Sequence, residues 1–241
     1  MTQEDAYSRT RILYGQCGID TLKQSHVAVF GLGGVGGSAA EALARAGIGT
    51  LDLIDSDKVT ESNLNRQILA LHSTIGRYKV DVAKERIADI DPSIQVHCFQ
   101  TFFLPETAKE FDFTQYDYVI DAIDTVTGKI EIIMQSKACG VPVISAMGCG
   151  NRIHPQELTV TDLFCTSEDP LAKVMRRELK RRGIQNLKVV WSREKPVPPH
   201  DKSCHDTHSS RHPIPGSVSF VPPAAGMMLA SEVVNDLVKT K

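Results

Sequence analysis

The sequence lacks the cysteine pattern that builds zinc sites or disulfide frameworks. Its six cysteines, at positions 17, 98, 139, 149, 165 and 204, contain no Cys-x-x-Cys pair. This absence removes the commonest structural zinc sites. Scattered cysteines are typical of free, mostly buried thiols in a reducing cytosol, so we expect a cytoplasmic protein.

The sequence also has little that would direct it into or across a membrane. Residues 1–5 are polar and acidic after the first methionine, so no secretory signal is expected. The longest uncharged run follows Arg211, and its prolines interrupt any helix of the about 20 residues that a bilayer requires. These prolines are Pro213, Pro215, Pro222 and Pro223. We therefore expect no membrane association.

A strong excess of positive charge is absent from the whole chain but present in one segment. The 27 Lys and Arg against 29 Asp and Glu give a net charge of −2, which argues against a globally basic nucleic-acid binder. Between Lys173 and Lys195, however, nine positive and two negative residues sum to +7, which leaves −9 for the rest. Helical spacing places five of the positive residues on one face, a candidate tRNA-binding surface, although a solvated helix is the alternative. They are Lys173, Arg176, Arg177, Lys180 and Arg181.

Short apolar runs alternate with longer segments of helical period over residues 25–148. This succession is typical of parallel strands joined by crossover helices. We expect strands at 27–30, 51–55, 94–99, 118–123 and 142–146, helices at 38–46, 80–90 and 126–139, and an acidic helix-like stretch before residue 118. The fold class is therefore α/β, a doubly wound Rossmann-like, mostly parallel sheet with an irregular C-terminal extension.

Residues 149–241 continue the same single domain, 1–241, as a substrate-facing part. We expect strands at 158–163 and 189–192 and helices at 171–182 and 224–239. Five prolines and few aliphatic residues in 196–215 predict a flexible loop. The loop also holds Cys204, His205, His208 and His212, but its polar, proline-rich surroundings do not favour a preformed metal site.

A glycine-rich turn follows the first expected strand and opens the next helix: Gly31-Leu32-Gly33-Gly34-Val35-Gly36. Glycines let backbone N–H groups approach phosphate oxygens, and a helix N-terminus favours negative charge. Asp55 ends the next strand, where a carboxylate can bind ribose hydroxyls. Alone, these features fit an NAD-dependent dehydrogenase or a nucleotide-sensing module as well as an ATP-dependent enzyme.

Three downstream motifs distinguish these alternatives. They are Ser62-Asn63-Leu64-Asn65-Arg66-Gln67, Gly76-Arg77-Tyr78-Lys79 and Asp121-Ala122-Ile123-Asp124. With them, residues 7–148 resemble the ThiF/MoeB/ubiquitin-activating superfamily, whose members adenylate carboxylates with ATP. The resemblance implies ATP and Mg²⁺ as cofactors.

The same resemblance implies a role for individual residues. Arg66 and Lys79 would hold the phosphates, Asn63 would support the α-phosphate, and Asp55 would bind the ribose. Asp124, expected as the last residue of its strand, would bind Mg²⁺, because carboxylate oxygens suit a hard cation. The nucleotide-binding set is Gly31, Gly33, Gly34, Gly36, Asp55, Asp57, Asn63, Arg66, Gln67, Lys79 and Asp124.

Catalysis would also use an arginine near the N-terminus. Arg9, within Tyr7-Ser8-Arg9, matches the arginine that the family inserts into the partner subunit's ATP site. The resemblance therefore implies a homodimer, with Arg9, Arg66, Lys79 and Asp124 as the catalytic residues. A solvated arginine near the chain terminus is the alternative for Arg9.

Three branches of the superfamily remain to be separated. The missing Cys-x-x-Cys pairs weaken a MoeB- or ThiF-like enzyme that adenylates the C-terminal Gly-Gly of a ubiquitin-like sulfur-carrier protein. The chain has no room for the catalytic-cysteine domain of ubiquitin-activating enzymes. The third branch, the tRNA threonylcarbamoyladenosine dehydratases, is similar to this chain at residues 9–15, 40–49, 190–194 and 216–222.

Similarity to this third branch implies a reaction and its partners. The reaction is ATP-dependent cyclisation of N6-threonylcarbamoyladenosine beside the tRNA anticodon, through an acyl-adenylate. The partners are tRNA, a second copy of the chain and, for some relatives, a cysteine-desulfurase sulfur relay.

Overall fold

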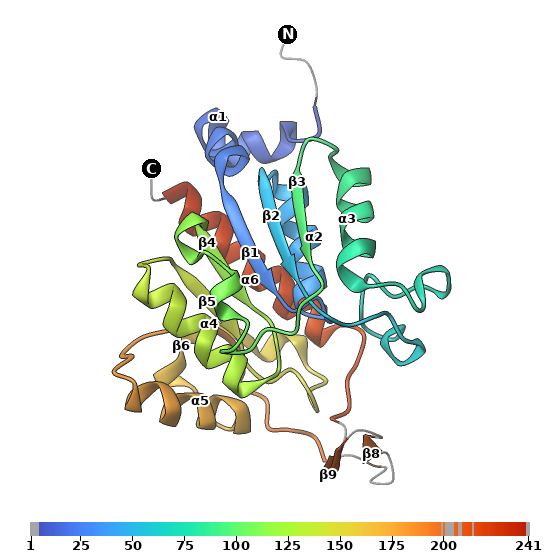
Figure 1. The fold of residues 1–241 in the computed structure, drawn as a ribbon, viewed down its shortest axis with the longest axis vertical. Coiled ribbons are helices and arrows are strands. Elements are labelled where there is room, and N and C mark those ends of the chain that lie inside the picture. The colour runs from blue at the N-terminus through green and yellow to red at the C-terminus, as the bar shows by residue number, and fades with distance from the viewer. Residues whose placement is uncertain (1–4, 199, 201–204, 207–208, 214, 240–241) are drawn as a thin grey trace.

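The computed structural model of the chain describes residues 5–198, 200, 205–206, 209–213 and 215–239. A seven-stranded sheet lies at its centre, with strand order β3-β2-β1-β4-β5-β7-β6 and helices on both faces (Figure 1). Strand β6 runs antiparallel to β7, and the other pairings are parallel. This arrangement confirms the expected α/β, doubly wound, mostly parallel fold. The strands are β1 (His26–Phe30), β2 (Thr50–Ile54), β3 (Gln95–Phe99), β4 (Tyr118–Asp121), β5 (Val143–Ala146), β6 (Leu158–Asp162) and β7 (Lys188–Ser192).

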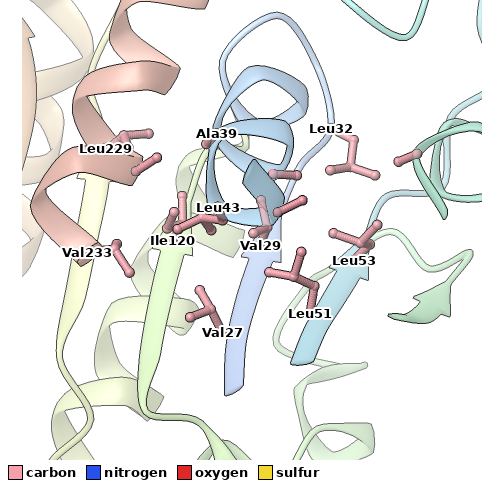
Figure 2. Close-up of a cluster of buried hydrophobic side chains, with 14 of the residues drawn as sticks. Val27, Val29, Leu32, Ala39, Leu43, Leu51, Leu53, Ile120, Leu229 and Val233 are labelled. Atoms are coloured by element: carbon pink, nitrogen blue, oxygen red, sulfur yellow. The ribbon is translucent and has the colours of Figure 1, made fainter. Parts of the chain in front are cut away.

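Helices cover the sheet because its strands carry apolar side chains on both faces. Val27 and Val29 point to the face covered by α2, α3 and α6, together with Leu51, Leu53 and Ile120 (Figure 2). Complete burial of such side chains contributes about 1.5–3 kcal/mol each. Phe30 belongs to the cluster on the opposite face, which is covered by α4 and α5. The helices are α1 (Ser8–Gln24), α2 (Gly36–Ala46), α3 (Lys79–Ile90), α4 (Val126–Ala138), α5 (Pro170–Arg181) and α6 (Val221–Lys239).

The acidic stretch between β3 and β4 does not form the expected α-helix. Its rings instead pack on Phe30, with centroids 4.8 Å away for Phe103 and 5.7 Å away for Phe113. Burial of these aromatic rings against the sheet outweighs the helical pattern of the segment. Its helical turns are 3-10 helices, η3 (Ala108–Glu110) and η4 (Phe113–Gln115). Other 3-10 helices are η1 (Glu61–Asn63), η2 (His72–Thr74), η5 (Pro155–Glu157) and η6 (Leu163–Cys165).

The N-terminal helix α1 was not expected from the sequence. Its apolar pattern is interrupted at Gly15, whose φ of 73° breaks the helix into two parts. The second part buries Ile19 and Leu22, whereas Ile12 and Leu13 in the first part are each 82% exposed. A helix that presents apolar residues to solvent has no single buried stripe, so periodicity could not identify it.

Helix α6 begins three residues earlier than expected. Pro222 and Pro223 occupy its first turn, where backbone N–H groups have no acceptor within the helix. The prolines therefore start the helix rather than precede it. Its Gly226 crosses α2 closely, because an added Cβ would lie 2.2 Å from the Val35 carbonyl oxygen.

Helix α5 is fixed to the sheet by polar contacts at its N-terminal end. Asp169 caps the helix by accepting a hydrogen bond from the Ala172 N–H at 3.1 Å. The indole N–H of Trp191, on β7, donates to the Ser167 carbonyl oxygen at 2.9 Å. The segment before α5 is therefore tied to the sheet through the only tryptophan of the chain.

The described part of residues 196–215 contains the short antiparallel pair β8 (His205–Asp206) and β9 (Ser209–Pro213). Residues 199, 201–204, 207–208 and 214 of the predicted loop lie outside the described residues. Among the helices that the structure describes, none combines the length and apolar content needed to cross a bilayer.

The five described cysteines are free thiols, as expected, but most of them are not buried. Cys17, Cys139 and Cys165 are exposed to solvent, while Cys98 and Cys149 are partly buried. Apolar residues next to a cysteine in the sequence did not distinguish buried cysteines from exposed ones, because exposed positions on helices also have apolar sequence neighbours.

Candidate active site

A cavity of about 610 Å³ lies at the carboxyl edge of the sheet, where β1 and β4 are neighbours. From β1 the chain continues to β2 and β3 on one side, whereas β4 leads to β5 on the other. Connections that leave in opposite directions open a crevice at this point in doubly wound sheets. The cavity is lined by the last residue of β2 and by residues that follow β1, β2, β3 and β4: Gly31, Gly33, Gly34, Ile54, Asp55, Ser56, Asp57, Lys58, Thr60, Asn63, Arg66, Gln67, Lys79, Thr101, Phe102, Phe103, Ala122, Ile123, Asp124 and Thr125.

The glycine turn forms one wall of this cavity. Gly31 adopts a φ of 87°, and a Cβ on Gly36 would lie 1.8 Å from the Gly31 carbonyl oxygen. The turn therefore needs glycine at both positions. Among the described residues, no backbone acceptor takes the N–H groups of Gly33 and Gly34, which remain available for an anionic ligand.

The Asp55 carboxylate fixes the shape of the turn. It accepts hydrogen bonds from the Leu32 N–H at 2.6 Å and the Asp57 N–H at 2.7 Å. Burial raises the pKa of Asp55, while the nearby Lys79 ammonium and these N–H donors partly offset that increase. Asp55 is thus placed beside the glycine turn with its charge only partly compensated.

Three cations line the cavity, and they differ in their partners. Lys79 is 4% exposed, and its Nζ lies 2.7 Å from Asp57 and 3.9 Å from Asp55. The Arg66 guanidinium donates to neutral oxygens, the Ser62 carbonyl and the Asn65 side chain. Lys58, the third, was not identified from the sequence. Arg66 therefore keeps a full positive charge facing the cavity.

Asn63 and Gln67 present amide groups to the same cavity. The Asn63 side-chain oxygen caps the start of η1 by accepting a hydrogen bond from the Thr60 N–H at 3.1 Å. Gln67 is 7% exposed, yet its Oε1 has no hydrogen-bond partner among the described residues. A buried amide oxygen without a protein partner is costly, so this atom favours a polar ligand in the cavity.

Asp124 lies in the cavity, but not at the end of a strand as expected. Strand β4 ends at Asp121, whose buried carboxylate pairs with the buried Lys129 ammonium at 3.0 Å. The Ser145 hydroxyl also donates to Asp121, and Lys129 donates to the Ile123 carbonyl oxygen at 2.9 Å. These contacts turn the chain out of the sheet before Asp124, which is exposed.

Sequence reasoning missed Lys129 and Asp121 as supports of the site. Lys129 is fully buried in the first turns of α4, and it holds the carbonyl next to Asp124. Its only signal in the sequence was a lysine directly before Ile130, in a segment whose apolar residues Ile132, Ile133 and Met134 surround no obvious polar partner. Periodicity alone does not reveal a buried ion pair.

Arg9 is not brought into the cavity of its own chain. It is exposed on α1 and borders a separate groove of about 390 Å³ formed with α2 and α6. The groove contains Leu13, Ala42 and Met227. The structure thus separates Arg9 from the other three expected catalytic residues within one chain.

Four of the five expected tRNA-binding residues are exposed on α5. They are Lys173, Arg177, Lys180 and Arg181. The fifth, Arg176, is half-buried and donates to the Thr166 carbonyl oxygen at 2.9 Å, so it anchors the helix instead of pointing freely outward. Glu178 pairs with Arg177, Arg181 and Arg182, which reduces the net charge of the face.

Cys149, which follows β5, is chemically quiet. Burial raises the pKa of Cys149 to about 12, so its thiol stays protonated at neutral pH. A protonated thiol is a weak nucleophile. Cys204, with the side chains of His205, His208 and His212, lies outside the described residues.

Comparisons with known proteins agree with this geometry. The chain matches the ThiF family over residues 7–241. It is similar to the curated tRNA threonylcarbamoyladenosine dehydratase of Bacillus subtilis, with 41% identity, covering 97% of this chain and 94% of that protein. Its structure is similar to that of Escherichia coli TcdA, tRNA N6-threonylcarbamoyladenosine dehydratase, in complex with AMP, with a TM-score of 0.88 and 33% identity. That match covers 100% of this chain and 98% of the other, and the ATP complex of TcdA matches with a TM-score of 0.87.

Two glycine variants separate the ligand role of the turn from its structural role. In Gly33→Ala the new Cβ meets nothing nearer than the Gln67 amide nitrogen at 3.9 Å, so the free energy of unfolding should change by less than about 1 kcal/mol. The methyl group would nevertheless occupy the side from which a phosphate approaches. We expect ATP affinity to fall at least about tenfold, or about 1.4 kcal/mol, measured by calorimetry.

Gly36→Ala is the contrasting variant. Its Cβ would collide with the Gly31 carbonyl oxygen, so the free energy of unfolding measured with denaturant should fall. Any loss of ATP binding in this variant would then follow from the damaged fold. Wild-type ATP affinity in Gly33→Ala would show that the glycine turn is not the phosphate cradle.

Proposed function

Because the chain belongs to the ThiF family, we propose that it uses ATP to dehydrate N6-threonylcarbamoyladenosine next to the anticodon of tRNA. The observation that carries this proposal is the single cavity that joins the glycine turn, Asp55, Arg66, Lys79 and Asp124. Similarity to a dehydratase along nearly the whole chain supports the choice of substrate over the Gly-Gly terminus of a sulfur-carrier protein.

The reaction proceeds in two steps. The threonyl carboxylate attacks the α-phosphorus of ATP, the bond to pyrophosphate breaks, and an acyl-adenylate forms. The neighbouring ureido group then attacks the activated carbonyl and expels AMP, which carries away one carboxylate oxygen. Since nucleophile and carbonyl share one small side chain, effective molarities of roughly 10⁵–10⁸ M favour ring closure without a cysteine intermediate.

The side chains of the cavity divide the work of the first step. Arg66 presents a planar guanidinium that can bind two phosphate oxygens, while Lys79 places a compact charge at the base of the cavity. Asp55 accepts hydrogen bonds from ribose hydroxyls, and Asn63 supports the α-phosphate. Lys129 holds the backbone of the loop that carries Asp124.

The charge balance of the cavity supports a need for Mg²⁺. Lys58, Arg66 and Lys79 are opposed by three carboxylates, those of Asp55, Asp57 and Asp124. The side chains of the cavity are therefore close to neutral in sum, and bound ATP would add roughly four negative charges. Among the described residues the Asp124 carboxylate has no partner, and such a group fits a hard, oxygen-binding cation. Bound Mg²⁺ would neutralise phosphate charge.

The position of Arg9 supports a homodimer in which it completes the partner's site. Its own cavity does not contain it, and the surface around it is apolar. Ile12 and Leu13 are each 82% exposed on the same helix, and Met227 on α6 is 47% exposed. A second copy of the chain would cover this surface and add the missing cation.

The exposed face of α5 supports contact with tRNA phosphates. Lys173 and Lys180 have no carboxylate partner among the described residues, unlike Arg177 and Arg181. Lysines without partners contribute most to phosphate binding that weakens with salt. A tRNA substrate also implies a cytoplasmic location for the protein. The expected cysteine-desulfurase sulfur relay stays a prediction.

Mass spectrometry of nucleosides tests the proposed reaction. Purified protein incubated with ATP, Mg²⁺ and threonylcarbamoylated tRNA should convert the modified nucleoside into a product lighter by one water. AMP and pyrophosphate should appear in equal amounts. We expect Lys79→Ala to reduce turnover at least about a hundredfold, because it removes the buried cation of the cavity.

Cys149→Ala is the matched control for this experiment. Its thiol is buried beside the same edge of the sheet, but it has no chemical role, so turnover should stay near that of the wild type. ATP–pyrophosphate exchange that required a Gly-Gly carrier protein and ignored the tRNA would favour the sulfur-carrier alternative. Tight NAD(H) binding without ATP consumption would favour a dehydrogenase.

A mixing experiment tests whether Arg9 acts across the dimer. Arg9→Ala and Lys79→Ala should each be nearly inactive alone. Equal mixing gives heterodimers in about half of the molecules, and one of their two sites carries neither change. We expect about a quarter of wild-type turnover to return after subunit exchange.

The opposite outcome is equally clear. If Arg9 acted within its own chain, every site in the mixture would keep one lesion, and no activity would return. Native mass spectrometry of mixed wild-type chains that carry tags of different mass serves as the control for subunit exchange.

Charge reversal on α5 tests the tRNA surface. We expect the double variant Lys173→Glu with Lys180→Glu to weaken tRNA binding at least about tenfold at low salt. The slope of log affinity against log salt should fall by about two, one for each lost phosphate contact. Filter binding at several salt concentrations measures both effects.

The control variant carries the same charge change elsewhere. Lys84→Glu with Lys109→Glu alters two exposed lysines away from α5 and should leave the salt slope unchanged. Equal loss in both double variants would mean that net charge, and not this helix, governs binding.

A further inference from the structure

A group of metal-binding side chains lies on the sheet away from the nucleotide cavity. Among the residues that the structure describes, His26, Asp52 and His97 each offer one ligand atom, and these atoms lie within 4.8 Å of one another. His26 is the first residue of β1, whereas the glycine turn follows the last, about 16 Å further along the strand.

The register of three neighbouring strands brings these side chains together. Asp52 on β2 is directly opposite His97 on β3 and Ala28 on β1. His26 precedes Ala28 by two residues, so it points to the same face of the sheet. Ligands on adjacent strands of a packed sheet are held more rigidly than ligands on loops.

The three side chains already converge on one point. His26 Nε2 and His97 Nδ1 each lie 2.7 Å from Asp52 Oδ1. The other carboxylate oxygen of Asp52 accepts a hydrogen bond from the Tyr116 hydroxyl at 3.0 Å. Such an outer partner orients a ligating carboxylate and is typical of built metal sites.

The surroundings of Asp52 suit a cation. The residue is 1% exposed, and its carboxylate faces two imidazoles instead of a lysine or arginine. A buried carboxylate with two imidazole neighbours is a ligand set for a borderline divalent metal.

We propose that His26, Asp52 and His97 form a binding site for a divalent transition metal of the Zn²⁺ class, independent of the proposed reaction. Tetrahedral coordination at about 2.0–2.1 Å separates ligand atoms by about 3.3 Å, so each imidazole nitrogen would move about 0.6 Å away from the Asp52 oxygen. To bind the metal, each neutral imidazole would move its proton from the nitrogen that faces Asp52 to its other ring nitrogen.

Access and chemistry select this metal class. The His97 side chain is 51% exposed, which gives an entry path and leaves a coordination position for water. Imidazole nitrogen favours Zn²⁺, Co²⁺ or Ni²⁺ over Mg²⁺ or Ca²⁺, which prefer all-oxygen sites. The metal would join the first residue of β1 to the middle residues of β2 and β3.

Cobalt absorption spectroscopy tests this site in the full chain. Chelator-treated protein titrated with Co²⁺ should develop the visible bands of tetrahedral nitrogen and oxygen coordination, and Zn²⁺ should abolish them at one metal per chain. We expect His97→Gln to weaken binding at least about tenfold, because one ligand is lost while the half-exposed position tolerates the change. His154→Gln, a change at an exposed histidine elsewhere, should bind Co²⁺ as the wild type does.

Two outcomes would overturn the proposal. One is undiminished metal affinity in His97→Gln and in His26→Gln. The other is an intense thiolate-to-cobalt band, which would place the metal on a cysteine such as Cys204. Thermal unfolding provides a second readout: Zn²⁺ should raise the midpoint of the wild type and of His154→Gln, but not that of His97→Gln.

Discussion

Close approach of two backbone segments at the turn between β1 and α2 is the constraint on which the site depends. The missing side chain of Gly36 lets the helix begin against the Gly31 carbonyl oxygen, so its first N–H groups face the cavity. Helix α6 holds the same turn from outside, because Cβ atoms on Gly34 and Gly226 would lie 2.9 Å from Pro222 and 2.2 Å from the Val35 carbonyl. The C-terminal helix and the nucleotide cavity are therefore parts of one packing unit.

Buried charges also position the residues of the cavity. Replacing a buried ion pair with apolar residues is often neutral or stabilising, so Lys129 and Asp121 are poorly explained by stability alone. This ion pair orients the backbone instead. The Lys129 ammonium holds the Ile123 carbonyl oxygen and so sets the path of the loop to Asp124. The cavity itself is lined by three cations and three carboxylates, so the charges of its side chains nearly balance.

Local patterns were sufficient to predict much of this arrangement. The strands and helices of the sheet differ from expectation by few residues, because the apolar runs of β1, β2, β4, β5 and β7 are largely buried. Asp55 could be placed because it directly follows a buried strand. Helix α1 and the segment around Phe103 could not, since one exposes apolar residues and the other gains its burial from rings far apart in the sequence.

The site shows the same division. The glycine turn and Asp55 followed from the sequence pattern, and the family resemblance implied the other expected site residues. Lys129 and the unpaired Gln67 oxygen depend on distances that only the packed structure defines. The placement of Arg9 likewise depends on how α1 bends at Gly15, and no local pattern reports that bend.

The hydrogen bond between Trp191 and Ser167 has a practical consequence. The chain has one tryptophan, nearly buried on β7 and joined through its indole to the segment that leads into α5. Its fluorescence emission therefore comes from a single known environment. A change in that emission reports on the junction between the sheet and the basic helix, so the protein carries its own optical probe at that place.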